Sequence, residues 1–308
     1  MIAKRLNVGD TIAIISPSAV LTDKEDLITL TKAVALMEEK GFKIIKGDYA
    51  FSNELGYGAS AIHKAEDINN MFKNQNVKAI FAITGGENSL STFDYIDFEN
   101  IKKNPKIICG FSDTTSILNE ITEKTWLVTF LGPSFKSIAS GETKYRLNAL
   151  LDRFLYHKDN LAYKEDLPEF RVIKRGKAEG KLIGGNLCLT TDLISGKYKI
   201  DFKNKILCLE DLAFESNPGR VSHDLYKMKQ EGVFNQIAGI WLGNYEGNIS
   251  IEQILLDTLS DMKFEKPIIK SENFGHSEKK IVIPIGTMAE IDTNADKPYI
   301  KLKGEFNA

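Results

Sequence analysis

A serine followed directly by an aspartate interrupts the apolar stretch KIICGFSDTTSIL, residues 106–118. A serine on a sharp turn between a strand and a helix exposes its hydroxyl group. The next backbone N–H then points into the same space, which is the arrangement of a nucleophile elbow. The usual G-x-S-x-G pattern has its second glycine where this chain has Thr114. The stretch alone is therefore equally consistent with Ser112 capping the following helix and Asp113 lying in its first turn.

A nucleophilic serine needs a base, and histidine suits this role because its unperturbed pKa lies near neutrality. His276 stands in ENFGHSEKK, after a glycine and before a strand, as expected of a residue presented by a loop. The other histidines lie in polar stretches typical of a surface: His63, His157 and His223. Glu210 ends the apolar run ILCL and is the candidate acid that orients the imidazole, with Asp211 as the nearest alternative.

The first half of the chain alternates apolar β-type runs with helical patterns. The runs at 11–18, 42–48, 78–86 and 106–113 alternate with helical periodicity at 23–42, 62–77 and 114–124. Strands rich in Ile and Ala on both faces predict a parallel sheet covered by helices on both sides. Functional groups in such sheets gather beyond the carboxyl ends of the strands, here ITGGENS, CGFSDTT and LCLEDL.

The second half of the chain has a different pattern. A charged stretch covers about 137–180, and short strands follow at 181–191, 205–212, 237–247, 280–292 and 297–304. Only two convincing helical patterns occur among them, near 219–232 and 251–262. We therefore expect an α/β protein with an N-terminal parallel-sheet α/β domain, residues 1–165, and a β-rich C-terminal domain, residues 170–308.

The composition narrows the function classes. Lys and Arg number 40 against 42 Asp and Glu, and no basic cluster interleaved with aromatic residues indicates nucleic-acid binding. No apolar run approaches the roughly 18 residues of a membrane span, and the start lacks a secretory signal, so we expect a cytoplasmic protein. The three cysteines are widely spaced in apolar stretches, as expected of reduced core residues. No zinc motif joins the scattered histidines, so we expect no metal and no cofactor.

Together these segments resemble the LD-carboxypeptidase family of serine peptidases, which includes the microcin C self-immunity hydrolases. The matching segments span almost the whole chain: SPS, TGGENS, GFSDTT, TFLGPS, GKLIGGNL, LCLEDL, GVFNQIAGIWLG, FGHS and IPIG. The spacing from the serine to the glutamate and on to the histidine also resembles that of the family. The combination is specific, whereas each motif alone is weak.

The resemblance implies Ser112 as nucleophile, Glu210 as orienting acid and His276 as general base. It also implies two domains with the active site at their interface, and it suggests a homodimer. The backbone N–H of Asp113 is the expected first oxyanion donor, and we prefer Gly86 to Gly85 for the second, although both glycines could simply serve a tight turn.

The preferred activity is removal of the terminal D-amino acid from a murein tetrapeptide during peptidoglycan recycling. Such an exopeptidase recognises a free carboxylate, and Arg220 is one candidate for that contact, with an ordinary helix-surface arginine as the alternative. The second candidate activity is that of the microcin C self-immunity branch, which cleaves the amide between a peptide or amino acid and a modified nucleotide.

Aromatic residues bear on the choice between these substrates. The immunity branch stacks a nucleobase on a tryptophan in a loop whose counterpart here, about 158–179, has no Trp and offers only Tyr163 and Phe170. Trp126 stands where the family usually has a helix-ending glycine, and we expect it to pack in the core. From a different class, a non-catalytic binding module on the same fold is a further alternative, and an intact set of Ser112, Glu210 and His276 argues against it.

Overall fold

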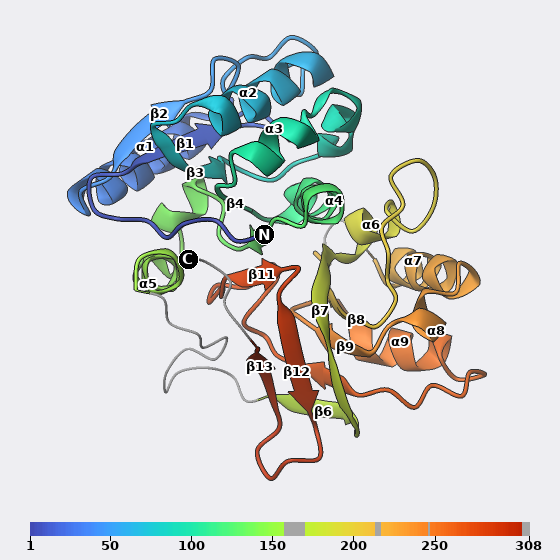
Figure 1. The fold of residues 1–308 in the computed structure, drawn as a ribbon. Coiled ribbons are helices and arrows are strands. Elements are labelled where there is room, and N and C mark those ends of the chain that lie inside the picture. Colours follow the sequence, from blue (N-terminus) through green and yellow to red (C-terminus); the bar gives the residue numbers. More distant parts are fainter. Residues whose placement is uncertain (157–169, 213–216, 246, 304–308) are drawn as a thin grey trace. The chain divides into compact units, whose positions relative to one another are not determined.

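The computed structural model describes residues 1–156, 170–212, 217–245 and 247–303 (Figure 1). The chain forms two compact units. The first comprises Met1–Lys158, Val282–Pro284 and Glu305–Ala308, and the second comprises Asp159–Ile281 and Ile285–Gly304. The residues between the two expected domains, 166–169, lie outside the described ranges, so the boundary remains a prediction.

The first unit is built on a six-stranded sheet in the order β11-β5-β4-β3-β1-β2. Its first five strands pair in parallel: β1 (Thr11–Ile15), β2 (Lys43–Lys46), β3 (Val77–Ala82), β4 (Ile107–Gly110) and β5 (Thr129–Leu131). β11 (Ile283–Ile285) takes the edge position next to β5. The strands β1, β3 and β4 are almost fully buried, as expected of a parallel sheet with helices on both faces.

Helices of this unit connect the parallel strands. The α-helices are α1 (Lys24–Glu39), α2 (Ala61–Lys73), α3 (Phe98–Lys103), α4 (Thr115–Thr125) and α5 (Thr143–Phe154). Three short 3₁₀ helices complete the unit: η1 (Ser89–Tyr95), η2 (Ser112–Thr114) and η3 (Lys136–Ala139). The helices α2, α3 and α4 pack in series, whereas α1 and α5 both contact η3 (Figure 1).

The second unit is built on a seven-stranded mixed sheet in the order β13-β12-β7-β8-β9-β10-β6. Its central strands are parallel: β7 (Lys177–Asn186), β8 (Lys205–Glu210), β9 (Gly239–Leu242) and β10 (Ile268–Lys270). The antiparallel strands are β6 (Arg171–Lys174), β12 (Met288–Asp292) and β13 (Tyr299–Leu302). Its helices are α6 (Leu187–Thr191), α7 (Pro218–Gln230), α8 (Val233–Gln236) and α9 (Ile251–Thr258).

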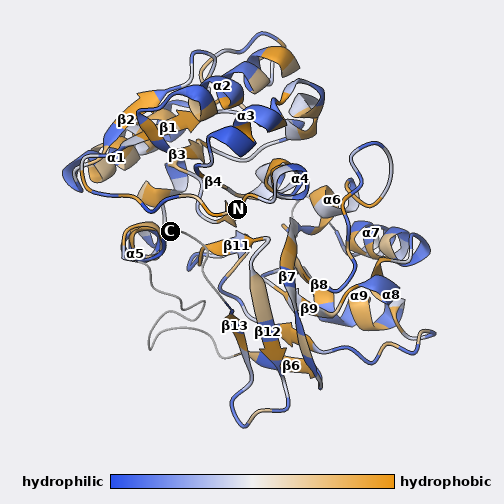
Figure 2. Ribbon diagram, viewed as in Figure 1, coloured by the Kyte–Doolittle hydropathy of each residue, from blue (hydrophilic) through white to orange (hydrophobic). Residues whose placement is uncertain are grey.

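Residues on the strands of both units are largely hydrophobic, whereas the helices mix hydrophobic and hydrophilic residues (Figure 2). The topology of the two sheets confirms the predicted fold class, a parallel-sheet α/β unit followed by a β-rich one. In the described parts of the chain, no helix is both long and apolar enough to span a membrane.

Two expected strands are corrected by the structure. The run 280–292 is two strands, β11 and β12, which Gly286 separates at a φ of +87° and which join different sheets. The end of the expected strand 181–191 is the helix α6, where the Asn186 side chain accepts a hydrogen bond from the N–H of Leu189 at 3.2 Å. In both cases local chemistry, a left-handed glycine and a helix cap, ends a run that apolar content alone would extend.

Candidate active site

Ser112 lies on a sharp turn between β4 and α4. Its φ is +61°, a left-handed conformation that non-glycine residues adopt only where the surrounding structure enforces it. A side chain at Gly110 would place its Cβ 2.4 Å from Oγ1 of Thr114, and the Thr114 hydroxyl donates to the Phe111 carbonyl at 2.9 Å. The turn is thus tight despite the missing second glycine, and Thr114, which occupies that position, closes it.

Ser112 does not cap a helix in the structure, contrary to the alternative that the sequence left open. The N-cap residue of η2 is Phe111 and that of α4 is Thr114, and neither helix start has a side-chain cap bond. Ser112 is half-buried and is itself the first residue of η2, with a left-handed φ. The geometry is therefore that of a presented hydroxyl rather than that of a cap.

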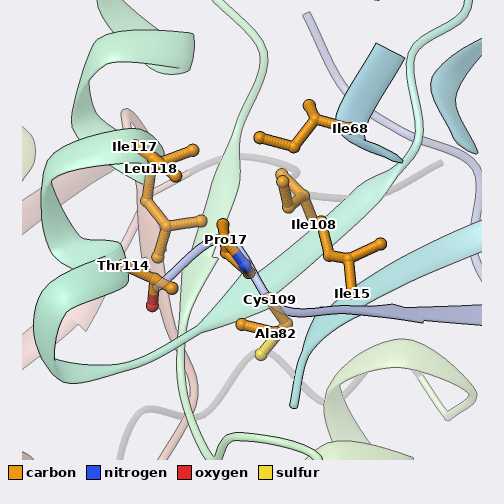
Figure 3. A pocket seen from close by; sticks show the side chains of 9 residues that line it. All are labelled: Ile15, Pro17, Ile68, Ala82, Ile108, Cys109, Thr114, Ile117 and Leu118. Atoms are coloured by element: carbon orange, nitrogen blue, oxygen red, sulfur yellow. The ribbon is translucent and has the colours of Figure 1, made fainter. Parts of the chain in front are cut away.

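A small apolar cavity of about 10 Å³ lies behind this turn (Figure 3). Its lining comes from β1, β3, β4, α2, α4 and the segments that follow these strands: Ile15, Pro17, Ile68, Ala82, Ile108, Cys109, Thr114, Ile117 and Leu118. Burial raises the pKa of the Cys109 thiol far above its usual range, so this cysteine is an inert packing residue. The cavity belongs to the core that supports the turn.

Asp113, the next residue, is almost fully buried and anchors the turn to the loop after β3. Its Oδ2 accepts the backbone N–H of Ser89 at 2.9 Å, and the Ser89 hydroxyl donates to the Asp113 carbonyl at 2.8 Å. Burial raises the pKa of Asp113, while hydrogen bonds from Ser18 and Ser89 and the charge of Lys64 act in the opposite direction. The backbone around Ser112 is thereby held in place from two sides.

The two glycines of TGGENS have different neighbours. A Cβ on Gly85 would lie 2.8 Å from Cβ of Ser112 and 3.2 Å from its Oγ, so the bare backbone of Gly85 packs directly against the serine. Gly86 has a φ of +133°, and a Cβ there would lie 2.4 Å from Cβ of Ala19. Both positions require glycine. The sequence pointed to Gly86, and it offered no signal for the contact of Gly85 with Ser112.

In the second unit, Glu210 and His276 form a direct pair. Glu210 ends β8 with no exposed surface, and its Oε2 lies 2.8 Å from Nδ1 of His276. The same oxygen accepts the backbone N–H of His276 at 3.1 Å. Gly275 permits this approach, because its φ is +96° and a Cβ there would lie 2.7 Å from Oε2 of Glu210. Asn244 donates to the His276 carbonyl at 2.9 Å.

This geometry sets the tautomer of the imidazole. An ionised carboxylate only accepts hydrogen bonds, so Nδ1 of His276 carries the hydrogen and Nε2 keeps its lone pair. The imidazole side chain is 16% exposed, whereas the glutamate is fully enclosed. A base of this kind, oriented by a buried acid, is suited to remove a proton from a hydroxyl.

The other residues singled out by the sequence have other partners. Asp211, the alternative acid, accepts from the side chain of Asn186 at 3.2 Å and from the N–H of Leu212 at 2.7 Å. Arg220, in the first turn of α7, pairs through Nε with Asp224 at 2.9 Å and is about half exposed. Its role in binding a substrate carboxylate remains a prediction.

The remaining histidines and the aromatic candidates are placed as follows. His63 stacks on Tyr49 with ring centroids 4.0 Å apart, His223 is exposed, and His157 and Tyr163 lie outside the described residues. Phe170 packs near the fully buried Trp241, with ring centroids 6.4 Å apart.

The expectation that Trp126 packs in the core is wrong. Trp126 is 75% exposed and ends α4 with a φ of +59°. Its left-handed backbone at the helix end directs the indole away from the core.

Across the described residues, no group of three or more His, Cys, Asp or Glu side chains is arranged to hold a metal ion. Ser112 and its loop lie in the first unit, and the Glu210–His276 pair lies in the second. Sequence reasoning missed Lys64 and Ser89, which surround Asp113, because nothing in the local pattern distinguishes them from surface residues.

Comparison with protein families gives two matches. The model described as LD-carboxypeptidase N-terminal domain matches residues 12–132, and the model described as LD-carboxypeptidase C-terminal domain matches residues 179–291. A probable murein peptide carboxypeptidase of Bacillus subtilis is 31% identical, over 94% of this chain and 91% of the relative. The microcin C7 self-immunity protein MccF of Escherichia coli is 27% identical, over 95% of this chain and 93% of its own.

Solved structures resemble the chain over its full length. MccF in complex with aspartyl sulfamoyl adenosine matches with a TM-score of 0.87 and 25% identity, covering 100% of both chains. An MccF-like protein from Bacillus anthracis matches with a TM-score of 0.87 and 29% identity, covering 99% of this chain and 100% of that one.

Proposed function

The chain belongs to the LD-carboxypeptidase family, and from this premise we propose that it is a serine hydrolase with Ser112 as nucleophile, His276 as general base and Glu210 as orienting acid. The observation that carries the proposal is the 2.8 Å contact between Glu210 Oε2 and Nδ1 of His276, which leaves Nε2 as a proton acceptor. The left-handed turn at Ser112 supports it, because strain at a presented serine is typical of nucleophiles.

In the proposed reaction Nε2 of His276 takes the proton of Ser112 as its Oγ attacks an amide carbonyl. The tetrahedral oxyanion is stabilised by the backbone N–H of Asp113 and by a second donor from the TGG turn, for which we propose Gly86. The protonated His276 then gives its proton to the leaving amine, and an acyl-enzyme forms on Ser112. Water attacks this ester with His276 again as base, and Ser112 is released.

The substrate that we propose first is a murein tetrapeptide, from which the enzyme removes the terminal D-amino acid. The 31% identical relative is named as a murein peptide carboxypeptidase and is matched over nearly its whole length. Arg220 is the proposed partner for the free carboxylate. Its guanidinium is about half exposed, with Nε bound to Asp224 and Nη2 donating to the sulfur of Cys188 at 3.5 Å, and its remaining N–H groups could reach a carboxylate.

A second candidate substrate is an amino acid or peptide joined to a modified nucleotide. It is supported by the likeness to MccF, whose solved structures include complexes with aspartyl sulfamoyl adenosine and glutamyl sulfamoyl guanosine at 25% identity. The packing of Phe170 near Trp241 argues against that ring as a free platform for a nucleobase.

A mass-spectrometric assay distinguishes these substrates. The purified protein and its Ser112→Ala variant are each incubated with a murein tetrapeptide and, separately, with an aminoacyl sulfamoyl adenosine. Loss of one D-alanine from the tetrapeptide by the wild type alone supports the carboxypeptidase. Cleavage of the adenosine compound alone favours the immunity-type hydrolase, and equal turnover by Ser112→Ala contradicts both.

A further inference from the structure

Lys64 is a buried cation in α2 that the proposed reaction does not use. Its side chain is 2% exposed, and Nζ makes no hydrogen bond to any residue in the described ranges. A lysine buried without a hydrogen-bonding partner is disfavoured by desolvation, and burial lowers the pKa of Lys64 accordingly. Such a residue needs a compensating neighbour.

Lys64 interacts electrostatically with Asp113 of the turn at Ser112, and it packs against Tyr57 and Gly58. The charge of the Asp113 carboxylate acts on Lys64 and opposes the effect of burial. The ammonium also lies over the ring of Tyr57, 4.9 Å from its centroid, which is cation–π geometry. A Cβ on Gly58 would lie 3.3 Å from Cε of Lys64, so the chain there closes directly over the lysine.

Tyr57 carries the arrangement on to the loop after β3. Its hydroxyl accepts a hydrogen bond from the side chain of Asn88 at 3.1 Å. The next residue, Ser89, donates its backbone N–H to Asp113. The cation–π contact and two hydrogen bonds thus link Lys64 through Tyr57 and residues 88 and 89 to Asp113, whose charge in turn acts on Lys64.

From these contacts we infer that Lys64 is a positioning residue for the oxyanion-binding backbone. Its charge holds the Asp113 carboxylate, and its stack with Tyr57 holds the loop that contains Gly86. The two expected N–H donors lie on the two segments on which Lys64 acts, so we expect their spacing to depend on this lysine. The inference rests on the proposed function, in which Asp113 and Gly86 supply those donors.

The test measures kcat and KM for Lys64→Met with whichever of the murein tetrapeptide and the aminoacyl sulfamoyl adenosine the wild type hydrolyses. We expect kcat to fall at least about tenfold and KM to change less than about threefold, since a lost oxyanion donor alone costs about 100-fold or more. The double variant Lys64→Met/Asp113→Asn is expected to regain part of kcat, because the carboxylate left unbalanced in the single variant is gone.

Lys106 provides the matched control. It is also a buried lysine of the first unit, but its Nζ donates to the backbone carbonyls of Met71 and Asn74, at the opposite end of β4 from Ser112. Lys106→Met is expected to lower the melting temperature and to leave kcat unchanged. A loss of kcat common to both lysine variants would assign Lys64 a merely structural role and overturn the inference.

Two further results complete the test. If Lys64→Met does not fold, Tyr57→Leu decides, because Tyr57 is 41% exposed and its ring is the surface on which Lys64 stacks. An unchanged kcat in that variant, whatever its KM, overturns the inference, as does a folded Lys64→Met with the wild-type kcat. Failure of the wild type itself to hydrolyse either substrate is instead a failure of the proposed function.

Discussion

One carboxylate oxygen holds the proposed base. Oε2 of Glu210 accepts both the ring N–H and the backbone N–H of His276, so it sets the position and the tautomer of the imidazole together. The other oxygen, Oε1, is buried and without a hydrogen-bonding partner in the described part of the chain. In the described part of the chain the hydrogen bonds of the Glu210 carboxyl group thus go to His276, where a carboxylate would stabilise the imidazolium that forms in the proposed reaction.

Replacing Glu210 by Gln tests this role. Gln keeps the size of the side chain but removes the charge, and its amide group can present a donor to Nδ1. We expect kcat to fall by about 100- to 10,000-fold with little change in KM, as for an orienting carboxylate in other serine hydrolases. Steady-state kinetics with circular dichroism as a fold control measures this.

Asp211→Asn is the comparison variant, since Asp211 bonds to Asn186 and to the backbone rather than to His276. Its kcat should fall far less than that of Glu210→Gln. The reverse order would show that the neighbouring acid, and not Glu210, acts on the histidine.

The sequence indicated some of these residues and not others, for a physical reason. Ser112, Glu210 and His276 stand next to strand ends or glycines, and that is a local signal. Ser89 lies 24 positions from its partner Asp113, and the charge of Asp113 acts on Lys64, which belongs to a different helix. Contacts of this kind follow from the packing of separate elements, which no local periodicity encodes.

At the scale of elements, the helix α4, which follows the turn at Ser112, ends at a tryptophan with a left-handed backbone conformation. The N–H of Trp126 donates to the Thr122 carbonyl at 2.8 Å, and Trp126 itself is left-handed. A residue with a Cβ in that conformation loses about 1–2 kcal/mol, which glycine avoids. Because the indole is exposed, it gains little packing energy to offset this backbone strain, whereas a buried indole would gain more.

Comparing the variants Trp126→Gly and Trp126→Ala therefore measures the backbone strain at this position separately from the packing of the side chain. Trp126→Gly should have a larger free energy of unfolding than Trp126→Ala by about 0.5–1 kcal/mol, after allowing for the greater unfolded-state entropy of glycine. Urea denaturation of the two variants measures the difference. A more stable alanine variant would contradict the left-handed helix end.

A contact of the helix α2 makes the free energy of unfolding depend on pH. Asp67 in α2 is buried, and its carboxylate oxygens each lie 3.2 Å from the backbone N–H of Tyr49. Burial raises the pKa of Asp67 to about 6. A carboxyl whose pKa is higher in the folded protein adds stability below the unfolded pKa of about 4, and that stability is lost as the pH rises to 6.

Asp67→Asn should remove this dependence. The stability of the variant relative to the wild type is expected to rise by up to roughly 3 kcal/mol between pH 4 and pH 7, the equivalent of the change in pKa. Chemical denaturation at a series of pH values measures it. Parallel curves for the two proteins over this range would show that Asp67 does not titrate as the structure implies.

Helices and strands could be predicted from the sequence where the apolar periodicity and the residues that end an element agree. The strands β1 to β4 and the helices α1 and α2 follow apolar periodicity that ends at glycines and caps. The division of residues 280–292 between two sheets could not be predicted from the sequence. Both halves are apolar, and only the tertiary fold determines which sheet each half joins. The short strand β5 and the helix α3 were likewise not predicted, since each is too brief for a periodic signal.

For the whole molecule, the composition and the balanced charge argued against a nucleic-acid-binding protein and a membrane protein. The order of motifs along the chain indicated the family. The matches to both LD-carboxypeptidase domain models confirm that assignment. We expect the stretch at about 158–179 to bear on the choice of substrate, and its residues up to 169 lie outside the described ranges. The suggested homodimer remains a prediction.

The most direct test of the central claim is to map the site of a fluorophosphonate adduct by peptide mass spectrometry, in a reaction that needs no knowledge of the substrate. We predict that the wild type is modified on Ser112, that Ser112→Ala takes no label, and that His276→Ala reacts at least about 100-fold more slowly, as expected on loss of a general base. A wild-type chain labelled elsewhere with Ser112 unmodified, or labelling of Ser112 undiminished in His276→Ala, would contradict the account.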